Sequence, residues 1–129
     1  MNSGEQLSRS ARQWIEAHYM DKFSLERLAG ALYVNGSYLL RVFKANTGMT
    51  LLAYHNRYRC IRAAELLVGT RKSVSEIADA CGFISPSHFS HVFRRVAGIS
   101  PAEYRNTAPA IRAEIFNRNE KRGNENGDC

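Results

Sequence analysis

The same pattern of apolar residues occurs twice in this chain, about fifty residues apart. Leu28 in the first copy corresponds to Ile77 in the second at an offset of 49 residues, whereas Phe43 corresponds to Phe93 at an offset of 50 residues. The two offsets pair further residues: Ala29 with Ala78, Leu32 with Cys81, Val34 with Phe83, Leu39 with Phe89, Val42 with Val92, Gly48 with Gly98 and Tyr54 with Tyr104. The paired positions are mostly apolar, and the residues between them differ. This combination predicts one small scaffold that is used twice to present two different surfaces.

Helical periodicity predicts an all-α fold, because almost no segment alternates in the manner of a strand. Each copy contains a short apolar helix, a tight turn and a second helix, which is the arrangement of a helix-turn-helix. Capping signals mark the helix starts, among them Ser24, Asn35 and the capping box from Ser73 to Glu76. We expect about seven helices, over 6–18, over 25–32, from Asn35 to Gly48, over 51–68, from Ser73, from Ser85-Pro86 to Gly98, and from Ser100 through Tyr104.

The domain organisation follows from these elements. We expect a first helix-turn-helix subdomain over 1–50, a linker helix over 51–69 and a second helix-turn-helix subdomain over 70–106. The linker helix has no proline or glycine before its last residue, so we expect it to be rigid. Residues 107–129 are polar, and we expect a disordered tail there, with one or two helical turns over 111–116.

The formal net charge of +6 suits a polyanionic partner. No run of residues approaches the roughly 18 apolar residues that a membrane span needs, and the first ten residues lack the apolar core of a signal peptide. We therefore expect a soluble cytoplasmic protein, associated with the nucleoid and not with a membrane.

The three cysteines show neither metal-ligand spacing nor a disulfide framework. Cys60 and Cys81 occupy apolar helical positions, so we expect buried thiols in a reducing compartment. Cys129 lies in the expected tail. An enzyme such as an alkyl-transfer repair protein would need an activated cysteine, and none of the three fits that role. We predict no enzymatic activity and no cofactor, and fast reaction of one thiol in the folded protein would reopen the alternative.

The second helix of a helix-turn-helix lies in the major groove of DNA, where its exposed N-terminal residues meet the base edges. In the first copy, helical periodicity turns Ser37, Leu40, Arg41 and Lys44 outward. Arg41 is able to make a bidentate contact to guanine, and Leu40 could pack on a thymine methyl group. Lys44 sits where a phosphate partner is expected. The alternative is that Arg41 and Lys44 are ordinary solvated charges.

In the second copy the same periodicity turns Ser87, His88, His91, Arg94 and Arg95 outward. His88 and His91 are three residues apart on a helix, but a metal site would need a further ligand and none is evident, so we predict no metal. Histidine distinguishes bases less well than arginine, so we expect this surface to contribute shape and phosphate contacts. The predicted phosphate contacts are Lys44, Ser85, Arg94 and Arg95.

The two copies resemble the DNA-binding domain of the AraC/XylS family of bacterial transcription regulators. The segment 73–104 contains E-I-A, G-F, S-x-F, V-F and S-P-x-E-Y in the family's register, and the first copy contains S-L-E-x-L-A and Y-L-x-R-V-F-K. The resemblance covers about residues 7–105. It implies two helix-turn-helix subdomains on a rigid helix, sequence-specific binding of double-stranded DNA, and regulation of transcription through contact with RNA polymerase. We expect an activator.

The resemblance also implies which residues contact bases: Ser37, Leu40 and Arg41 in the first copy, and Ser87, His88 and His91 in the second. Three residues depart from the family's pattern. His91 stands where the family usually has arginine, Cys60 stands where the linker helix usually has leucine, and Gly36 adds mobility at the start of the first recognition helix.

Most family members carry a ligand-binding or dimerisation domain, and from the length of the sequence we expect none here. The resemblance is therefore to the stand-alone subgroup typified by MarA and SoxS, and we expect a monomer. Its two recognition helices should enter successive major grooves, about 10–10.5 bp apart, over an asymmetric site of roughly 20 bp. The alternatives are an isolated DNA-binding fragment of a larger regulator and an antagonist or interaction module that has lost DNA binding.

Overall fold

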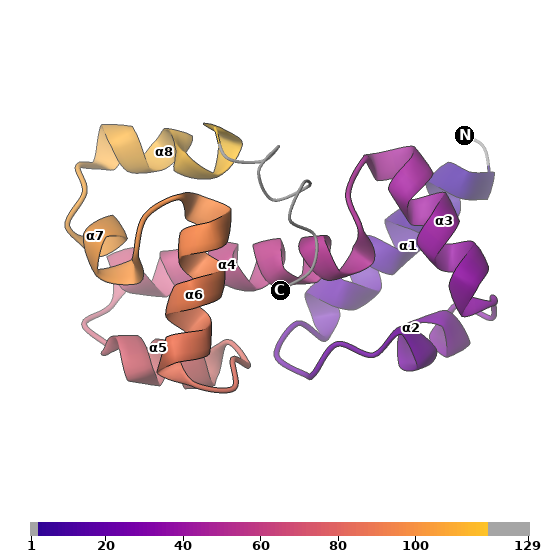
Figure 1. Cartoon of the computed structure of the whole chain (residues 1–129), viewed down its shortest axis with the longest axis horizontal. Coiled ribbons are helices and arrows are strands. Elements are labelled where there is room, and N and C mark those ends of the chain that lie inside the picture. The colour runs from indigo at the N-terminus through magenta and orange to yellow at the C-terminus, as the bar shows by residue number, and fades with distance from the viewer. Residues whose placement is uncertain (1–2, 119–129) are drawn as a thin grey trace.

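The computed structural model of the chain describes residues 3–118. These residues form eight α-helices and no strand, arranged as an elongated molecule in Figure 1. The helices are α1 (Ser3–Ala17), α2 (Leu25–Ala31), α3 (Gly36–Thr47), α4 (Leu51–Gly69), α5 (Val74–Ala80), α6 (Pro86–Ala97), α7 (Pro101–Arg105) and α8 (Pro109–Arg118). The all-α prediction is confirmed, with one helix more than expected. No described helix is both long enough and apolar enough to cross a membrane.

Helices α1 to α3 and the start of α4 surround a first hydrophobic core, made of Ala11, Ile15, Leu28, Ala29, Leu39, Phe43 and Leu51. The helix ends follow the predicted capping chemistry. The side chain of Ser24 accepts a hydrogen bond from the backbone N–H of Arg27, and Asn35 Oδ1 accepts one from Tyr38, each at 3.1 Å. Helix α3 ends at Gly48, whose φ of 77° lies in the left-handed region. These caps fix the start and the end of α3.

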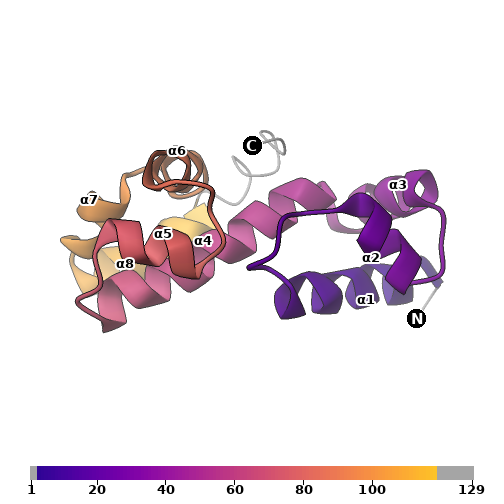
Figure 2. The same ribbon diagram turned by 90° about the horizontal axis from the view of Figure 1, so that it is seen from below.

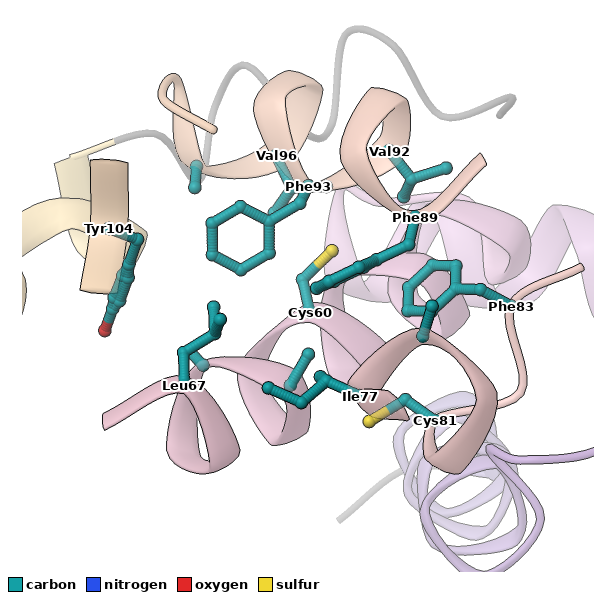
Figure 3. Packing of buried hydrophobic residues seen from close by; sticks show 14 of the residues in the cluster. Cys60, Leu67, Ile77, Cys81, Phe83, Phe89, Val92, Phe93, Val96 and Tyr104 are labelled. Carbon is teal, nitrogen blue, oxygen red and sulfur yellow. The ribbon is translucent and has the colours of Figure 1, made fainter. Parts of the chain in front are cut away.

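The second core joins the C-terminal half of α4 to helices α5–α8 (Figure 3). Its largest side chains form a ladder of rings in tilted or edge-on contact: Phe83 with Phe89, Phe89 with Phe93, and Phe93 with Tyr104, with centroids 4.8–5.6 Å apart. Capping boxes start α5 and α7, as predicted. The ladder holds the inner face of α6 and so decides which of its residues face outward.

Both cysteines that lie in the described part of the chain are buried in this second core, as expected. Cys60 and Cys81 are each 0% exposed (Figure 3). Burial raises the pKa of the Cys81 thiol, which keeps it protonated. A protonated, inaccessible thiol is the opposite of an activated nucleophile. Cys129 lies outside the described residues.

Helix α4 connects the two cores (Figures 1 and 2). Leu51 at its start belongs to the first core, whereas Cys60 and Leu67 belong to the second. Its C-terminal end is capped from α7: Arg105 Nε donates to the carbonyl of Leu67 at 2.9 Å, and Arg105 Nη2 donates to that of Lys72 at 2.6 Å. The carbonyl of Leu67, in the last turn of α4, is thus bonded to a cation, which the helix dipole favours at this end, and Lys72 lies in the connection that follows.

The prediction of a disordered tail over 107–129 is wrong for residues 109–118, which form α8. Ile115 is 5% exposed in the second core, and Phe116 packs edge-on against Phe93 and Tyr104. The expectation of one or two turns over 111–116 was too short. This helix is stabilised by burial against α6 and not by its own sequence pattern, which is only weakly amphipathic. The remainder of the expected tail, 119–129, lies outside the described residues.

Candidate nucleic-acid interface

Helix α3 carries the first set of predicted DNA-contacting residues on its outer face. Leu39 and Phe43 are fully buried beneath it, whereas Ser37, Leu40 and Arg41 are exposed. Leu40 leaves 42% of its surface accessible, so its apolar side chain is available to a partner. The structure therefore places the three predicted base-contacting residues of the first copy together, near the N-terminal end of α3.

Tyr38 is a neighbour of this site that sequence reasoning missed. The guanidinium carbon of Arg41 lies 5.4 Å from the centroid of the Tyr38 ring, and Tyr38 is 40% exposed. A cation over a ring restricts the conformations of a long side chain, so Arg41 is partly ordered before any partner arrives. The signal was present in the sequence as an aromatic residue three positions before an arginine on one helix.

Lys44 lies on the last turn of α3. Its Nζ donates a hydrogen bond to the carbonyl of Gly48 at 3.1 Å. A lysine at a helix C-terminus is favoured by the helix dipole, so this side chain already has a structural role. The contact is exposed, and a phosphate could replace it at small cost.

Helix α6 carries the second set. Ser85 caps its N-terminus by accepting a hydrogen bond from His88 N–H at 3.0 Å, and Ser87 and His91 are exposed. The interpretation of His88 as an outward residue needs correction. Its ring is half-buried and packs edge-on against Phe83, with centroids 5.7 Å apart. Burial, followed by the positive charge of Arg59, lowers the pKa of His88, so this histidine is neutral at pH 7.

The two arginines of α6 differ in exposure. Arg94 is exposed and forms an ion pair with Glu103 of α7, with Nη2 and Oε1 3.6 Å apart. The Ser100 capping box lowers the pKa of Glu103, so its carboxylate is charged and shares this surface with Arg94. Arg95 is half-buried, and its prediction as an outward residue is only partly right. An exposed ion pair contributes little stability and can yield to another anion.

The two helices lie on one side of the molecule. In Figure 2, α3 and α6 are both seen nearly end-on at the edge opposite α1, one in each half of the molecule. In Figure 1 both helices rise in a similar direction from their N-terminal to their C-terminal ends. The described residues contain no group of three His, Cys, Asp or Glu side chains that could hold a metal ion. The arrangement offers two separated polar and basic surfaces that one extended anion could touch together.

Comparison with known proteins gives consistent matches. A family profile described as a helix-turn-helix domain matches residues 28–107. The transcriptional activator RhaS of Enterobacter sp. (strain 638) is 41% identical over 92 residues, which are 71% of this chain and 33% of that protein. The chain spans about a third of the length of the curated relatives it matches.

Solved structures agree with this result. The DNA-binding domain of the transcription factor AdpA, in complex with a target DNA, superposes with a TM-score of 0.72 at 34% identity, covering 83% of this chain and 96% of that one. A transcriptional regulator of AraC type from Chromobacterium violaceum gives a TM-score of 0.75 at 35% identity, covering 81% of this chain and 95% of that one.

Proposed function

Because the chain belongs to the AraC/XylS family of DNA-binding transcription regulators, we propose that it binds an asymmetric DNA site of roughly 20 bp with α3 and α6 in successive major grooves. One observation carries this proposal: the two second helices of the repeated motif lie on one side of the molecule, joined by one uninterrupted helix (Figure 2). Successive major grooves on one face of DNA are about 10–10.5 bp apart. A binding protein with this shape meets both grooves without encircling the duplex.

The two helices should contribute unequally to sequence recognition. On α3, Arg41 can donate two hydrogen bonds to one guanine, and the exposed Leu40 can cover a thymine methyl group. On α6, neutral His88 and exposed His91 offer fewer donors in less fixed geometry. We therefore assign most base discrimination to Ser37, Leu40 and Arg41, and a smaller share to Ser87, His88 and His91.

The electrostatic part of binding should come from Lys44, Arg94 and Arg95, together with helix N-termini, and the uncharged Ser85 should contact a phosphate through a hydrogen bond from its hydroxyl group. If these groups neutralise about six phosphates, the affinity should fall roughly 10³-fold between 50 and 200 mM salt. The exposed partners of Lys44 and Arg94 within the chain are weak enough to be exchanged for phosphate oxygens.

The test is a selection from random duplex DNA with the purified chain near 150 mM salt, followed by sequencing. We expect an asymmetric motif with two conserved segments one helical turn apart, the stronger one belonging to α3. A single short segment would show that α6 only holds phosphates. No motif, with tight binding only at low salt, would contradict the proposal and favour the antagonist or the isolated fragment of a larger regulator.

We further propose that the bound protein activates transcription through RNA polymerase. The support is the name of the relative RhaS, an activator that is about three times longer than the matched region. The measurement is transcription from a promoter carrying the selected motif, with purified RNA polymerase and increasing protein. Transcript levels that fall as the protein is added would identify a repressor instead. Sedimentation of the protein with and without DNA tests the proposed monomer in the same samples.

A further inference from the structure

Arg59, in the middle of α4, is a buried arginine whose partners lie far away in the sequence. It is 5% exposed. Its Nε donates to the carbonyl of Tyr19, and its Nη2 donates to the carbonyl of Asp21, each at 2.6 Å. Both carbonyls belong to the connection between α1 and α2. A buried charge is stable only when its hydrogen-bonding groups are matched, so this contact ties α4 firmly to the first helix-turn-helix unit.

The same guanidinium also contacts the second helix-turn-helix unit. Its carbon lies 5.5 Å from the ring centroid of Phe83, which belongs to the turn between α5 and α6. Phe83 in turn packs against His88 of α6. One side chain therefore contacts the α1–α2 connection on one side and the turn that precedes the second candidate recognition helix on the other.

Gly82 makes a second contact between the same two segments. A Cβ atom at this position would lie 2.3 Å from the carbonyl oxygen of Met20, so no other residue fits without moving the backbone. The φ of Gly82 is also positive, at 87°. Tyr33, in the corresponding turn of the first unit, has a φ of 59° and is 94% exposed. The turn of the first unit thus accepts the side chain of Tyr33 at a positive φ, because that position is exposed. The turn of the second unit requires glycine at position 82, because the backbone of Met20 lies against it.

Tyr19 extends the contact. It packs against the second core, although its backbone belongs to the first unit. Its ring meets Tyr58 edge-on at 5.3 Å and lies 5.9 Å from the guanidinium carbon of Arg62. We give the name inter-unit clasp to the contacts between the two units that are made by Arg59, Phe83, Gly82 and the backbone of Met20.

We propose that the inter-unit clasp fixes the distance and the rotation between α3 and α6, and that Arg59 is the positioning residue through which the protein selects the number of base pairs between the two halves of its DNA site. Without the clasp, the two units would be joined by α4 and by the packing of Tyr19 against the second core. Inserting one base pair moves a half-site by about 3.4 Å and rotates it by about 35° around the duplex. A clasped protein cannot follow that change unless the DNA deforms, which costs free energy, whereas a hinged protein can.

This inference rests on the proposed function, and its test uses the two-segment motif that the random selection is expected to yield. Binding is measured on duplexes whose spacer is cognate or changed by one or two base pairs. We expect the wild-type chain to bind at least about tenfold more weakly after a change of one base pair. Arg59→Met keeps the apolar stem of the side chain and removes its hydrogen-bond donors. The affinity of this variant should fall by no more than about threefold when the spacer is changed by one base pair. Arg59→Lys should restore part of the discrimination, since an ammonium group can still donate to the carbonyls of Tyr19 and Asp21.

A second pair of variants guards against misfolding of the Arg59 variants. Gly82→Ala forces the α5–α6 turn away from Met20 and should also relax the spacing preference. Gly48→Ala is its matched control, because Gly48 also has a positive φ, 77°, but a Cβ there would meet nothing within 4 Å. Gly48→Ala should lose stability and keep the spacing preference. A role in stability alone would weaken binding equally on all spacers and leave the ratio unchanged.

A measurement without DNA separates this inference from the proposed function. Spin labels on cysteines introduced at the exposed Ala45 and Ala102, in a Cys129→Ser background, report the distance between the two units. We expect a narrow distribution in the parent and a broad one in Arg59→Met and Gly82→Ala. A narrow distribution in both variants, or an unchanged spacer ratio, would overturn the role of the clasp. A wild-type protein that selects no two-segment motif but shows the narrow-to-broad change would contradict the proposed function and leave the clasp supported.

Discussion

His55 in α4 is a buried histidine whose protonation should limit the stability of the protein in mild acid. It is 3% exposed, and neither ring nitrogen has a hydrogen-bond partner within the described part of the chain. Its ring packs edge-on against Phe23 at 5.4 Å. Burial, followed by the positive charge of Arg59, lowers the pKa of His55 from 6.5 to about 4. The folded state therefore holds this imidazole neutral.

The direction of the effect follows from the two pKa values. The folded pKa lies below the unfolded one, so the unfolded state binds more protons between pH 6.5 and 4. The stabilisation is fully present above pH 6.5 and is lost as the pH falls toward 4. A shift of this size gives a loss of about 2 kcal/mol at pH 5 and about 3 kcal/mol at the low-pH limit.

The perturbation is His55→Leu, which removes both ring nitrogens at similar volume. Urea unfolding at pH 7.5 and pH 5 is the assay. The wild-type free energy of unfolding should fall between the two conditions by about 2 kcal/mol from His55 and by a smaller amount from other groups such as His88, whose pKa is also lowered, and the variant should lose only the smaller amount. At pH 7.5 the variant should be more stable by about 1 kcal/mol, because two buried polar atoms without partners are removed.

The matched control is His91→Leu, on the exposed face of α6, which should keep the loss of stability that comes from His55. If His55→Leu loses as much stability at pH 5 as the wild type does, another group is responsible and the argument from burial fails. If the variant is less stable at pH 7.5, the ring nitrogens have partners after all.

Three further predictions concern the proposed site and the fold. Arg41→Ala should weaken binding to the selected motif by about 1–3 kcal/mol and relax the preference at one base pair, whereas Arg9→Ala, at an exposed position of α1, should do neither; an unchanged base preference in a repeated selection would remove Arg41 from base recognition. Lys44→Ala should weaken binding about equally on all sequences and lower the slope of log affinity against log salt by about 1, so a salt titration with an unchanged slope would show that Lys44 meets no phosphate. Ile115→Ala should lower the free energy of unfolding by about 2–5 kcal/mol, because Ile115 is buried in the second core; a change below about 0.5 kcal/mol in urea unfolding would show that α8 does not contribute to the fold.

The parts of the fold that the sequence predicted are those set by local chemistry. The capping boxes at Ser73 and Ser100 and the left-handed glycines Gly48 and Gly98 act through atoms only a few residues away. Their effect is therefore visible in a short window of sequence. The repeat added the long-range information that the two halves share one architecture.

The parts that were missed depend on partners distant in the chain. Helix α8 forms because Ile115 and Phe116 pack against the aromatic rings of the second core, and no capping residue in the sequence predicted its start. His88 lies on the expected face of α6, but the position of Phe83 half-buries it. Arg59 looks like a solvated charge in sequence and is buried because two carbonyls of the α1–α2 connection meet it. Periodicity predicts the face of a helix, not what packs against it.

The candidate site shows the same division. The sequence predicted which residues of α3 are exposed, and the structure agrees for Ser37, Leu40 and Arg41. It could not predict that Arg41 packs over the ring of Tyr38, or that Lys44 and Arg94 already have weak partners. The base and phosphate contacts themselves stay predictions, since each depends on the position of a duplex.

The clasp changes what the weaker helix can contribute. If α3 anchors the protein through Arg41, a rigid connection holds α6 at a fixed place over the next groove. The contacts of Ser87 and His91 then form without a further loss of translational and rotational freedom, as in any linked pair of binding modules. A hinged protein would lose that advantage, because each orientation of α6 would be populated only in part. A second helix with modest contacts of its own can therefore add specificity only in a protein whose two units are held together, which is why we place Arg59 and Gly82 beside Arg41 as determinants of recognition.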